Sequence, residues 1–355
     1  MDKHTTHQTE RKRLHDLTAT LLSPETSGAQ LQAATRELNA LFDRLSPLIR
    51  KDLLEEQYAP TFLEQGIAAS VNCAALCAED PLRVSRFLQG IERAIGEAQT
   101  RFPSITIHLL YAGTGPYATL VTPLLTRHSP AGLQVTMLDI HRESLDSLRA
   151  ILGALGLEAF VKAYLQTDAS RYRHPKNDPI HIVVSETMTS GLMMEMQVPI
   201  TLNLAPQLTE NGLWIPESVR ITAVAGRPEH LLVPIDRTAP PPYPQLVADR
   251  ELGTLFRIGK DEGCALATMK GEDSLPAETI KIPIDLKPEH AILLHTEITI
   301  FGDIHLTGHD STLNHLVPMP VGVSALPGHR TPLRYRLGTH PGLECTSPCA
   351  APTVE

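Results

Sequence analysis

The sequence predicts an α/β protein in which a doubly wound parallel sheet follows a helical cap and precedes an all-β, barrel-like region. Three patterns carry this prediction. Apolar residues recur at helical spacing in residues 1–100. Strand-like and helix-like segments alternate in residues 101–220, which is typical of a parallel sheet covered by helices. Short β-like runs and prolines fill residues 221–345, and a tail follows at 346–355.

Composition and charge narrow the classes of function. The chain has 355 residues, of which 42% are hydrophobic, and a formal net charge of −9. No dense basic run indicates a nucleic-acid partner, and no apolar stretch approaches the ~20 residues of a membrane span. The polar start has no apolar segment typical of a secretory leader, so we expect a cytoplasmic protein. The cysteines and histidines lack the spacing of a disulfide framework or a metal site, and we predict neither.

The helical cap is expected to contain three helical stretches. The last of them should begin at Pro81, because proline suits the first helical position and Asp80 can cap the amino end. Apolar residues such as Phe87 and Ile91 then lie on one face, and the pattern continues to Thr100.

A glycine turn opens the central region. In ITIHLLYAGTGPYATL, residues 105–120, an apolar run stops at Tyr111 and gives way to a turn containing Gly113 and Gly115. Glycines allow a ligand to approach the backbone closely. A helix is expected over residues 117–127, so that the turn presents free backbone N–H groups and a positive helix end to a nucleotide-like ligand.

Acidic residues follow three successive strands of the predicted sheet: Asp139, Asp168 and Glu186. Ligands of such sheets bind beyond the carboxyl ends of the strands. Asp139 lies 24 residues after Gly115, where an acid can accept hydrogen bonds from a ribose diol. Asp168 is placed to read the amino group of an adenine. Each of these two aspartates could instead cap a helix at the end of its strand.

The stretch VVSETMTSGLMMEM carries a more specific resemblance. The turn and acids together resemble class I S-adenosylmethionine-dependent methyltransferases, and this stretch is similar to the double-glutamate loop of protein arginine methyltransferases. Glu186 and Glu195 stand nine residues apart, as in that loop. The resemblance spans residues 60–340 and is strongest at 107–220. It implies a Rossmann-like core, S-adenosylmethionine as cofactor, a homodimer, and two glutamates that orient a cationic nitrogen.

Further residues match or depart from that family. Arg83 resembles the arginine that grips the cofactor carboxylate, and Ser185, which precedes the first glutamate, is another candidate for cofactor binding. Tyr111 replaces the acid of the usual glycine motif and Tyr117 its third glycine, so either ring could contact the cofactor or simply pack. Pro341 replaces the tryptophan of a Thr-His-Trp signature.

We therefore expect an S-adenosylmethionine-dependent transferase acting on an amine or guanidine nitrogen of a small molecule in a biosynthetic pathway. A second possibility follows from YAGTGPYA, which is similar to the turn of nicotianamine synthase-like enzymes. Such enzymes transfer the aminocarboxypropyl arm, and azetidine-2-carboxylate synthases cyclise that arm and release methylthioadenosine. In that reaction the cofactor itself is the substrate. A third possibility is a non-catalytic nucleotide-binding scaffold. Separately, Glu195 could merely start a helix and face solvent instead of pairing with Glu186.

Overall fold

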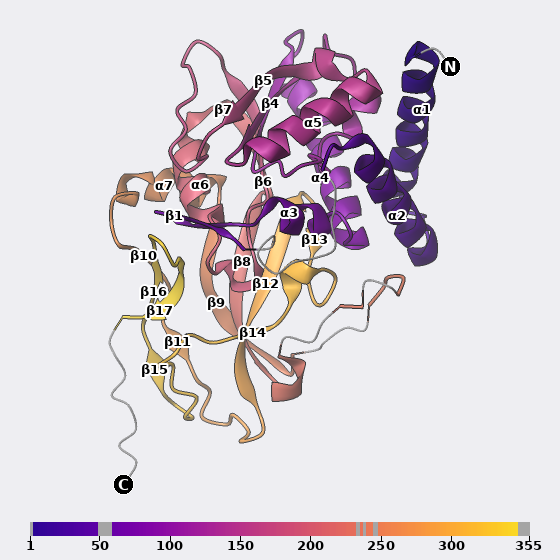
Figure 1. Cartoon of the computed structure of the whole chain (residues 1–355). Coiled ribbons are helices and arrows are strands. Elements are labelled where there is room, and N and C mark those ends of the chain that lie inside the picture. The colour runs from indigo at the N-terminus through magenta and orange to yellow at the C-terminus, as the bar shows by residue number, and fades with distance from the viewer. Residues whose placement is uncertain (1–2, 49–58, 232–234, 237–238, 244–247, 347–355) are drawn as a thin grey trace.

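The computed structural model describes residues 3–48, 59–231, 235–236, 239–243 and 248–346. Three regions follow one another along the chain (Figure 1): helices at the amino end, a parallel sheet with helices on both faces, and antiparallel sheets at the carboxyl end. This order confirms the expected α/β fold class. Apart from Thr346, the expected tail lies outside the described residues.

The amino-terminal region is largely helical, as predicted. Ser27 and Gln30 form a capping box at the start of one helix, and Asp80 caps another, which begins at the expected Pro81. A short antiparallel hairpin, which the sequence did not predict, lies between them in the chain. The elements are α1 (Lys3–Leu22), α2 (Gly28–Leu45), β1 (Thr61–Leu63), β2 (Gly66–Ala68), α3 (Val71–Cys77) and α4 (Pro81–Arg101).

The central sheet has five parallel strands in the order β5-β4-β3-β6-β7. Neighbouring residues of β3 face opposite sides: Leu109 packs in the same core as α4 and α5, whereas Leu110 packs with Ile200 and Leu204 of α6. Helices therefore cover both faces, which confirms the doubly wound arrangement. The elements are β3 (Ile107–Ala112), β4 (Leu133–Asp139), α5 (Arg142–Leu155), β5 (Val161–Gln166), β6 (Ile180–Ser185), α6 (Gln197–Leu204) and β7 (Leu208–Ile215).

The prediction of a helix over residues 117–127 is wrong. The segment forms turns and a short 3-10 helix, η2 (Leu124–Thr126). Ala118 adopts a left-handed φ of 43°, which an α-helix does not accommodate, and Pro123 offers no backbone N–H for a helical hydrogen bond. The apolar spacing of this segment reflects burial of nearly every side chain rather than one face of a helix.

The carboxyl-terminal region is built of antiparallel strands, as predicted, but they form separate five-, three- and two-stranded sheets. In β12 every second residue from Leu294 to Ile300 is buried, the alternation expected of a half-covered strand. A short helix, α7 (Lys260–Leu266), was not predicted. The strands are β8 (Ser218–Gly226), β9 (Arg250–Gly259), β10 (Ser274–Pro276), β11 (Ile280–Lys281), β12 (Ala291–Phe301), β13 (Ile304–Leu306), β14 (Val317–Pro318), β15 (Arg330–Thr331), β16 (Leu333–Arg336) and β17 (Gly342–Cys345).

Helix α4 joins the regions by packing against β7 of the central sheet and β12 and β13 of the carboxyl-terminal one. Asp80, at its amino end, is fully buried. One carboxylate oxygen accepts from the Arg83 N–H at 3.1 Å, and the other accepts from Ser311 Oγ and Thr312 N, each at 2.8 Å. The cap of α4 therefore also fixes a loop of the carboxyl-terminal region.

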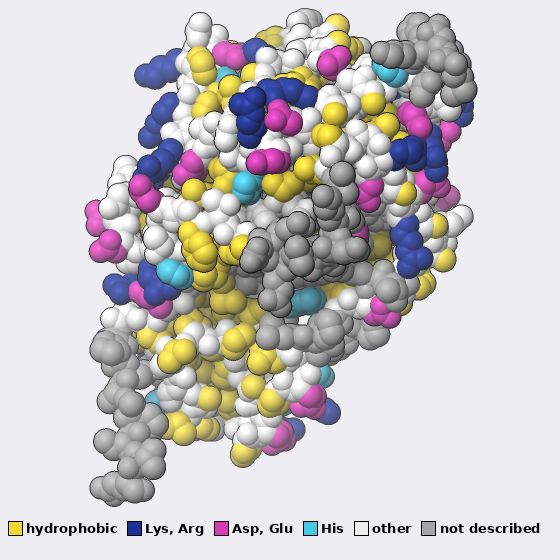
Figure 2. Space-filling view, viewed as in Figure 1, with side chains coloured by type: hydrophobic (Ala, Val, Ile, Leu, Met, Phe, Trp, Pro, Cys, Tyr) yellow, Lys and Arg dark blue, Asp and Glu magenta, His cyan; other side chains and the backbone are white. Residues whose placement is uncertain are grey.

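Within the described residues, none of the helices combines the length and apolar character needed to cross a bilayer. On the face drawn in Figure 2, Lys and Arg side chains are interspersed with Asp and Glu rather than gathered in one basic patch.

Candidate active site

A cavity of about 490 Å³ lies beyond the carboxyl ends of β3, β4 and β6. This is where ligands bind in doubly wound sheets, and the volume lies within the range of small-molecule sites. All three regions of the chain contribute to its lining. The predicted site residues that line it are Arg83, Tyr111, Gly113, Gly115, Asp139, Glu186 and Glu195.

The glycine turn forms part of the cavity wall. Gly113 and Gly115 adopt left-handed φ angles of 76° and 60°, and a Cβ on Gly113 would lie 2.4 Å from Thr187 Cγ2. The expectation of free backbone N–H groups is wrong. Gly113 N donates to the Leu138 carbonyl at 2.9 Å, and Gly115 N donates to Asp139 at 2.8 Å. These hydrogen bonds fasten the turn to β4, and no α-helix end follows it.

Asp139 is the residue to which the turn is fastened. Its Oδ2 accepts from Gly115 N at 2.8 Å and from Thr114 Oγ1 at 3.3 Å, and its Oδ1 accepts from His141 N at 2.8 Å. The ring Nδ1 of His141 also lies 3.5 Å from Oδ1. A carboxylate has about four acceptor positions, and the carboxylate lines the cavity, where a ligand hydroxyl can reach it. Asp139 is therefore not the N-cap of α5, which is His141, but fastens the glycine turn from a position in the cavity wall.

Arg83 and Glu186 form a buried ion pair in the cavity. Arg83 donates to Glu186 Oε2 from Nε at 3.0 Å and from Nη2. Their side chains are only 8% and 5% exposed. Burial raises the pKa of Glu186, while the guanidinium of Arg83 opposes that rise. Glu186 Oε1 is buried and has no hydrogen-bond partner among the described residues, so it is available to a ligand.

Glu195 is held in a strained loop before α6. Leu192 and Met194 both have left-handed φ angles. The loop is fixed from two sides, because Ile67 N donates to the Met194 carbonyl and Met194 N donates to the Pro341 carbonyl, each at 2.8 Å. Burial, followed by the charge of Glu186, raises the pKa of Glu195 to about 7. The side chain lines the cavity and does not start the helix.

Tyr111 and Cys77 stand beside the ion pair. Burial raises the pKa of the Tyr111 phenol, which therefore stays neutral and can donate a hydrogen bond. Burial also raises the pKa of the Cys77 thiol, so this cysteine is not an activated nucleophile.

Three predicted cofactor residues do not line the cavity: Tyr117, Asp168 and Ser185. The Tyr117 hydroxyl donates to Asp43, so this tyrosine has the packing role that the sequence left open. Asp168 accepts from Ser170 N at 2.8 Å, although its two neighbours in the chain line the cavity. That Tyr117, Asp168 and Ser185 contact a cofactor stays a prediction.

Several lining residues escaped the sequence analysis. Helix α3 contributes Ala74 and Cys77, and the carboxyl-terminal region contributes residues around the 3-10 helix η8 (Thr312–Asn314). No motif marks either segment. The carboxyl-terminal residues are Thr312, Leu313, His315 and Val317.

Comparison with known proteins adds two solved structures. No protein-family model and no curated protein matches the chain. One similar chain belongs to the Trypanosoma brucei PRMT1 enzyme–prozyme heterotetrameric complex with AdoHcy, at 12% identity and a TM-score of 0.47. Another is Arabidopsis thaliana protein arginine methyltransferase 10 in an open conformation, at 11% identity and a TM-score of 0.49. Each match covers 73% of this chain and 86% of the other. At these values the functional argument rests on the cavity itself.

Proposed function

We propose that this chain is an S-adenosylmethionine-dependent transferase that acts on a nitrogen nucleophile of a small molecule. The observation that carries the proposal is one cavity lined by two sets of acidic groups. Asp139 lies beside the glycine turn, and Glu186 and Glu195 lie with Arg83. A nucleoside bearing a sulfonium and an amino-acid arm has matching chemistry, since it has a diol at one end and cationic groups toward the other.

The residues of the cavity fit this cofactor. Asp139 lies in the cavity wall, where its carboxylate can accept from a ribose hydroxyl, and the unpartnered Oε1 of Glu186 suits the cationic nitrogen of an acceptor. Gly113 leaves open the space that a Cβ would fill. When bound, S-adenosylmethionine would supply an electrophilic carbon next to its sulfonium.

Glu186 and Glu195 would hold and deprotonate the acceptor. Glu186 is already bonded to Arg83 and provides a fixed anionic group. Glu195, with a pKa of about 7, can take a proton near neutral pH. An α-amino group has a pKa of about 7.7–8.0, which matches such a base, whereas a guanidinium does not lose its proton in proteins. This difference favours an amine acceptor over a guanidine.

The match between the pKa of Glu195 and that of an α-amino group also supports a second candidate function. The cofactor carries an α-amino group of its own, so Glu195 could deprotonate that amine and allow it to close a ring on the amino-acid arm. The products would be azetidine-2-carboxylate and methylthioadenosine. A homodimer and the identity of any separate acceptor remain predictions.

Product analysis separates these candidates. Purified protein is incubated with S-adenosylmethionine, alone and with a panel of small amines and guanidines, and the nucleoside products are measured by mass spectrometry. S-adenosylhomocysteine that appears only with an added amine supports the transferase. Methylthioadenosine above the no-enzyme background, formed without any acceptor and together with a new small amino acid, supports the cyclase and rejects methyl transfer.

Glu186→Gln tests whether the cavity is the site of turnover. We expect this variant to lose turnover, because the pair loses its anionic member. Glu143→Gln is the matched control, since Glu143 is exposed in the first turn of α5. Equal turnover in both variants would reject the proposed site, and no turnover by the wild type with any acceptor would leave a binding protein without catalysis.

A further inference from the structure

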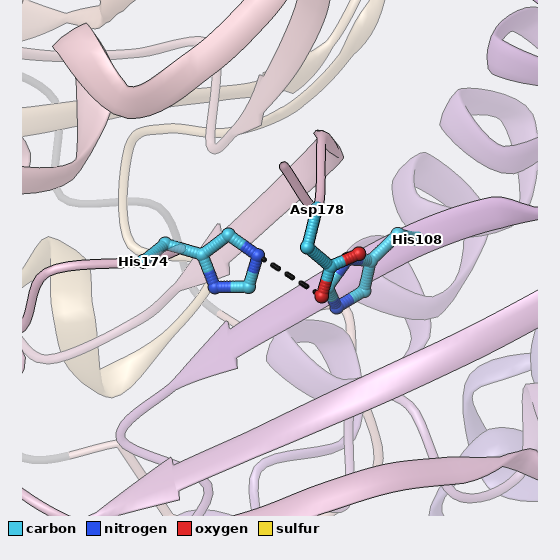
Figure 3. A group of neighbouring side chains, drawn as sticks. All are labelled: His108, His174 and Asp178. Carbon is cyan, nitrogen blue, oxygen red and sulfur yellow. Dashed lines mark ion pairs between the residues drawn. The ribbon is translucent and has the colours of Figure 1, made fainter. Parts of the chain in front are cut away.

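A second group of polar side chains lies at the opposite edge of the central sheet from the cavity. His108 is the second residue of β3, and His174 and Asp178 belong to the segment between β5 and β6. In Figure 3 the imidazole of His174 and the carboxylate of Asp178 point toward one another, next to His108. One nitrogen of each histidine and a carboxylate oxygen all lie within 4.8 Å of one another.

His174 presents a buried nitrogen that lacks a hydrogen-bond partner. Its side chain is 7% exposed, and Nε2 has no such partner among the described residues. Nε2 lies 3.4 Å from Asp178 Oδ2, longer than an ordinary hydrogen bond. The hydroxyl of Tyr172 lies 3.0 Å from Nδ1 of the same ring. If Nδ1 donates to Tyr172, a nitrogen lone pair faces a carboxylate oxygen, and a cation between them would relieve the repulsion.

His108 can offer a second nitrogen. Its Nε2 lies 2.8 Å from Thr136 Oγ1, which can accept a hydrogen bond from a protonated Nε2. Nδ1 lies 3.2 Å from the Pro179 carbonyl, which can only accept, so this nitrogen donates there. Moving the ring proton to Nε2 would free Nδ1, which lies 3.5 Å from Asp178 Oδ1, for a metal. Thr136 and Tyr172 thus stand where metal-bound imidazoles usually donate their second N–H.

We propose that His108, His174 and Asp178 form a zinc-binding site that fastens the segment between β5 and β6 to the start of β3. Zinc bonds of about 2.0–2.1 Å in a tetrahedron place neighbouring ligand atoms about 3.3–3.4 Å apart. The nitrogens of His108 and His174 lie 3.5 and 3.4 Å from different oxygens of Asp178, and one ligand atom of each residue lies within 4.8 Å of the others, so a small approach of the side chains would complete the site. Two imidazoles and one carboxylate select zinc over calcium or magnesium, which prefer oxygen ligands. The site lies away from the cavity, so its role is structural.

Lys162 is the competing cation. Its ammonium group bonds to Asp178 Oδ1 and its side chain is 42% exposed, whereas Oδ2 faces His174. Zinc would therefore bind next to Oδ2 and repel Lys162. Replacing Lys162 by methionine removes this repulsion, so the proposal predicts tighter zinc binding by Lys162→Met.

Calorimetric titration with zinc chloride tests the site on tag-free full-length protein stripped with a chelator. The wild type is expected to bind one zinc ion and to unfold at a higher temperature with zinc than without it. His174→Gln and Asp178→Asn should weaken binding by roughly tenfold or more. His128→Gln is the matched control, because His128 pairs with Glu92 at 2.8 Å without a second histidine.

Absence of one-to-one zinc binding by the wild type would overturn the proposal. So would unchanged affinity in His174→Gln and Asp178→Asn, because the zinc would then bind elsewhere. If these two variants do not fold, Lys162→Met decides: tighter binding than the wild type supports the site, and unchanged affinity overturns it. In the latter case the cluster is a polar contact in which Lys162 supplies the cation that pairs with Asp178.

Discussion

Arg83 donates two hydrogen bonds to a single oxygen of Glu186 inside the cavity, leaving the other carboxylate oxygen without a hydrogen-bond partner among the described residues. The pair joins α4, which carries Arg83, to the end of β6. It therefore fixes the Glu186 carboxylate and helix α4 in one arrangement.

Replacing only one member of this ion pair should lower the free energy of unfolding. Arg83→Met leaves the Glu186 carboxylate buried without its cation, and we expect a loss of about 3–5 kcal/mol in the free energy of unfolding. The double variant Arg83→Met/Glu186→Met removes both charges and should be clearly more stable than the single one. Urea unfolding measures both. Equal stability of the single variant and the wild type would show that the pair does not form.

Glu195 should make stability depend on pH. Folding raises the pKa of this carboxyl from 4.5 to about 7, so the folded chain binds more protons than the unfolded chain between these values. The stabilisation is fully present below about pH 4.5 and is lost as the pH rises through about 7. Its size is at most about 3 kcal/mol. Urea unfolding of the wild type and Glu195→Gln across this range isolates the effect. Parallel curves for the two proteins would refute the raised pKa.

Gly113→Ala should destabilise the chain more than the same change at Gly156. Both glycines have left-handed φ angles, so each substitution costs about 1–2 kcal/mol from the backbone. Only at Gly113 does the added Cβ also collide with Thr187 Cγ2, because nothing lies within 4 Å at Gly156. Thr187→Ser removes that methyl group and should restore part of the loss. Thermal unfolding of the three variants provides the comparison, and equal losses at both glycines would contradict the close packing.

Asp80→Ala should disconnect the amino end of α4 from the loop around Thr312, which lines the cavity. The variant leaves the N–H groups of Arg83 and Thr312 and the hydroxyl of Ser311 without their acceptor. We expect a loss of roughly 2–4 kcal/mol in unfolding free energy, the sum of a lost cap and lost buried hydrogen bonds. Asp303→Ala is the control, because Asp303 pairs with Arg93 at the surface. Hydrogen exchange around residue 312 should rise in Asp80→Ala only; unchanged exchange would argue against the connection.

The sequence was most informative where a local rule decides the structure. Asp80 and Pro81 mark the start of α4, and Asp139 and Glu186 follow buried strands whose ends meet at one edge of the sheet. Glu195 was predicted from its nine-residue spacing to Glu186, which matches the double-glutamate loop. The structure places both residues in the lining of the same cavity.

Other features depend on contacts between distant segments, which no local pattern records. The segment after Gly115 has helical spacing, yet burial on all sides and a left-handed Ala118 produce turns. The pairing of Arg83 with Glu186 and the approach of Thr312 to the cavity join residues more than a hundred positions apart. Tyr117 lies two residues after Gly115, but its ring packs against Phe42 of α2 and does not line the cavity.

Equilibrium dialysis with S-adenosylmethionine tests the central claim most directly. The folded wild type is predicted to bind one cofactor per chain. Asp139→Ala should weaken binding by roughly 1–3 kcal/mol, and Asp146→Ala, at the surface of α5, should not. Glu186→Gln should retain affinity while losing turnover. Failure of the folded wild type to bind the cofactor, or equal binding by Asp139→Ala and the wild type, would contradict the assignment of the cavity.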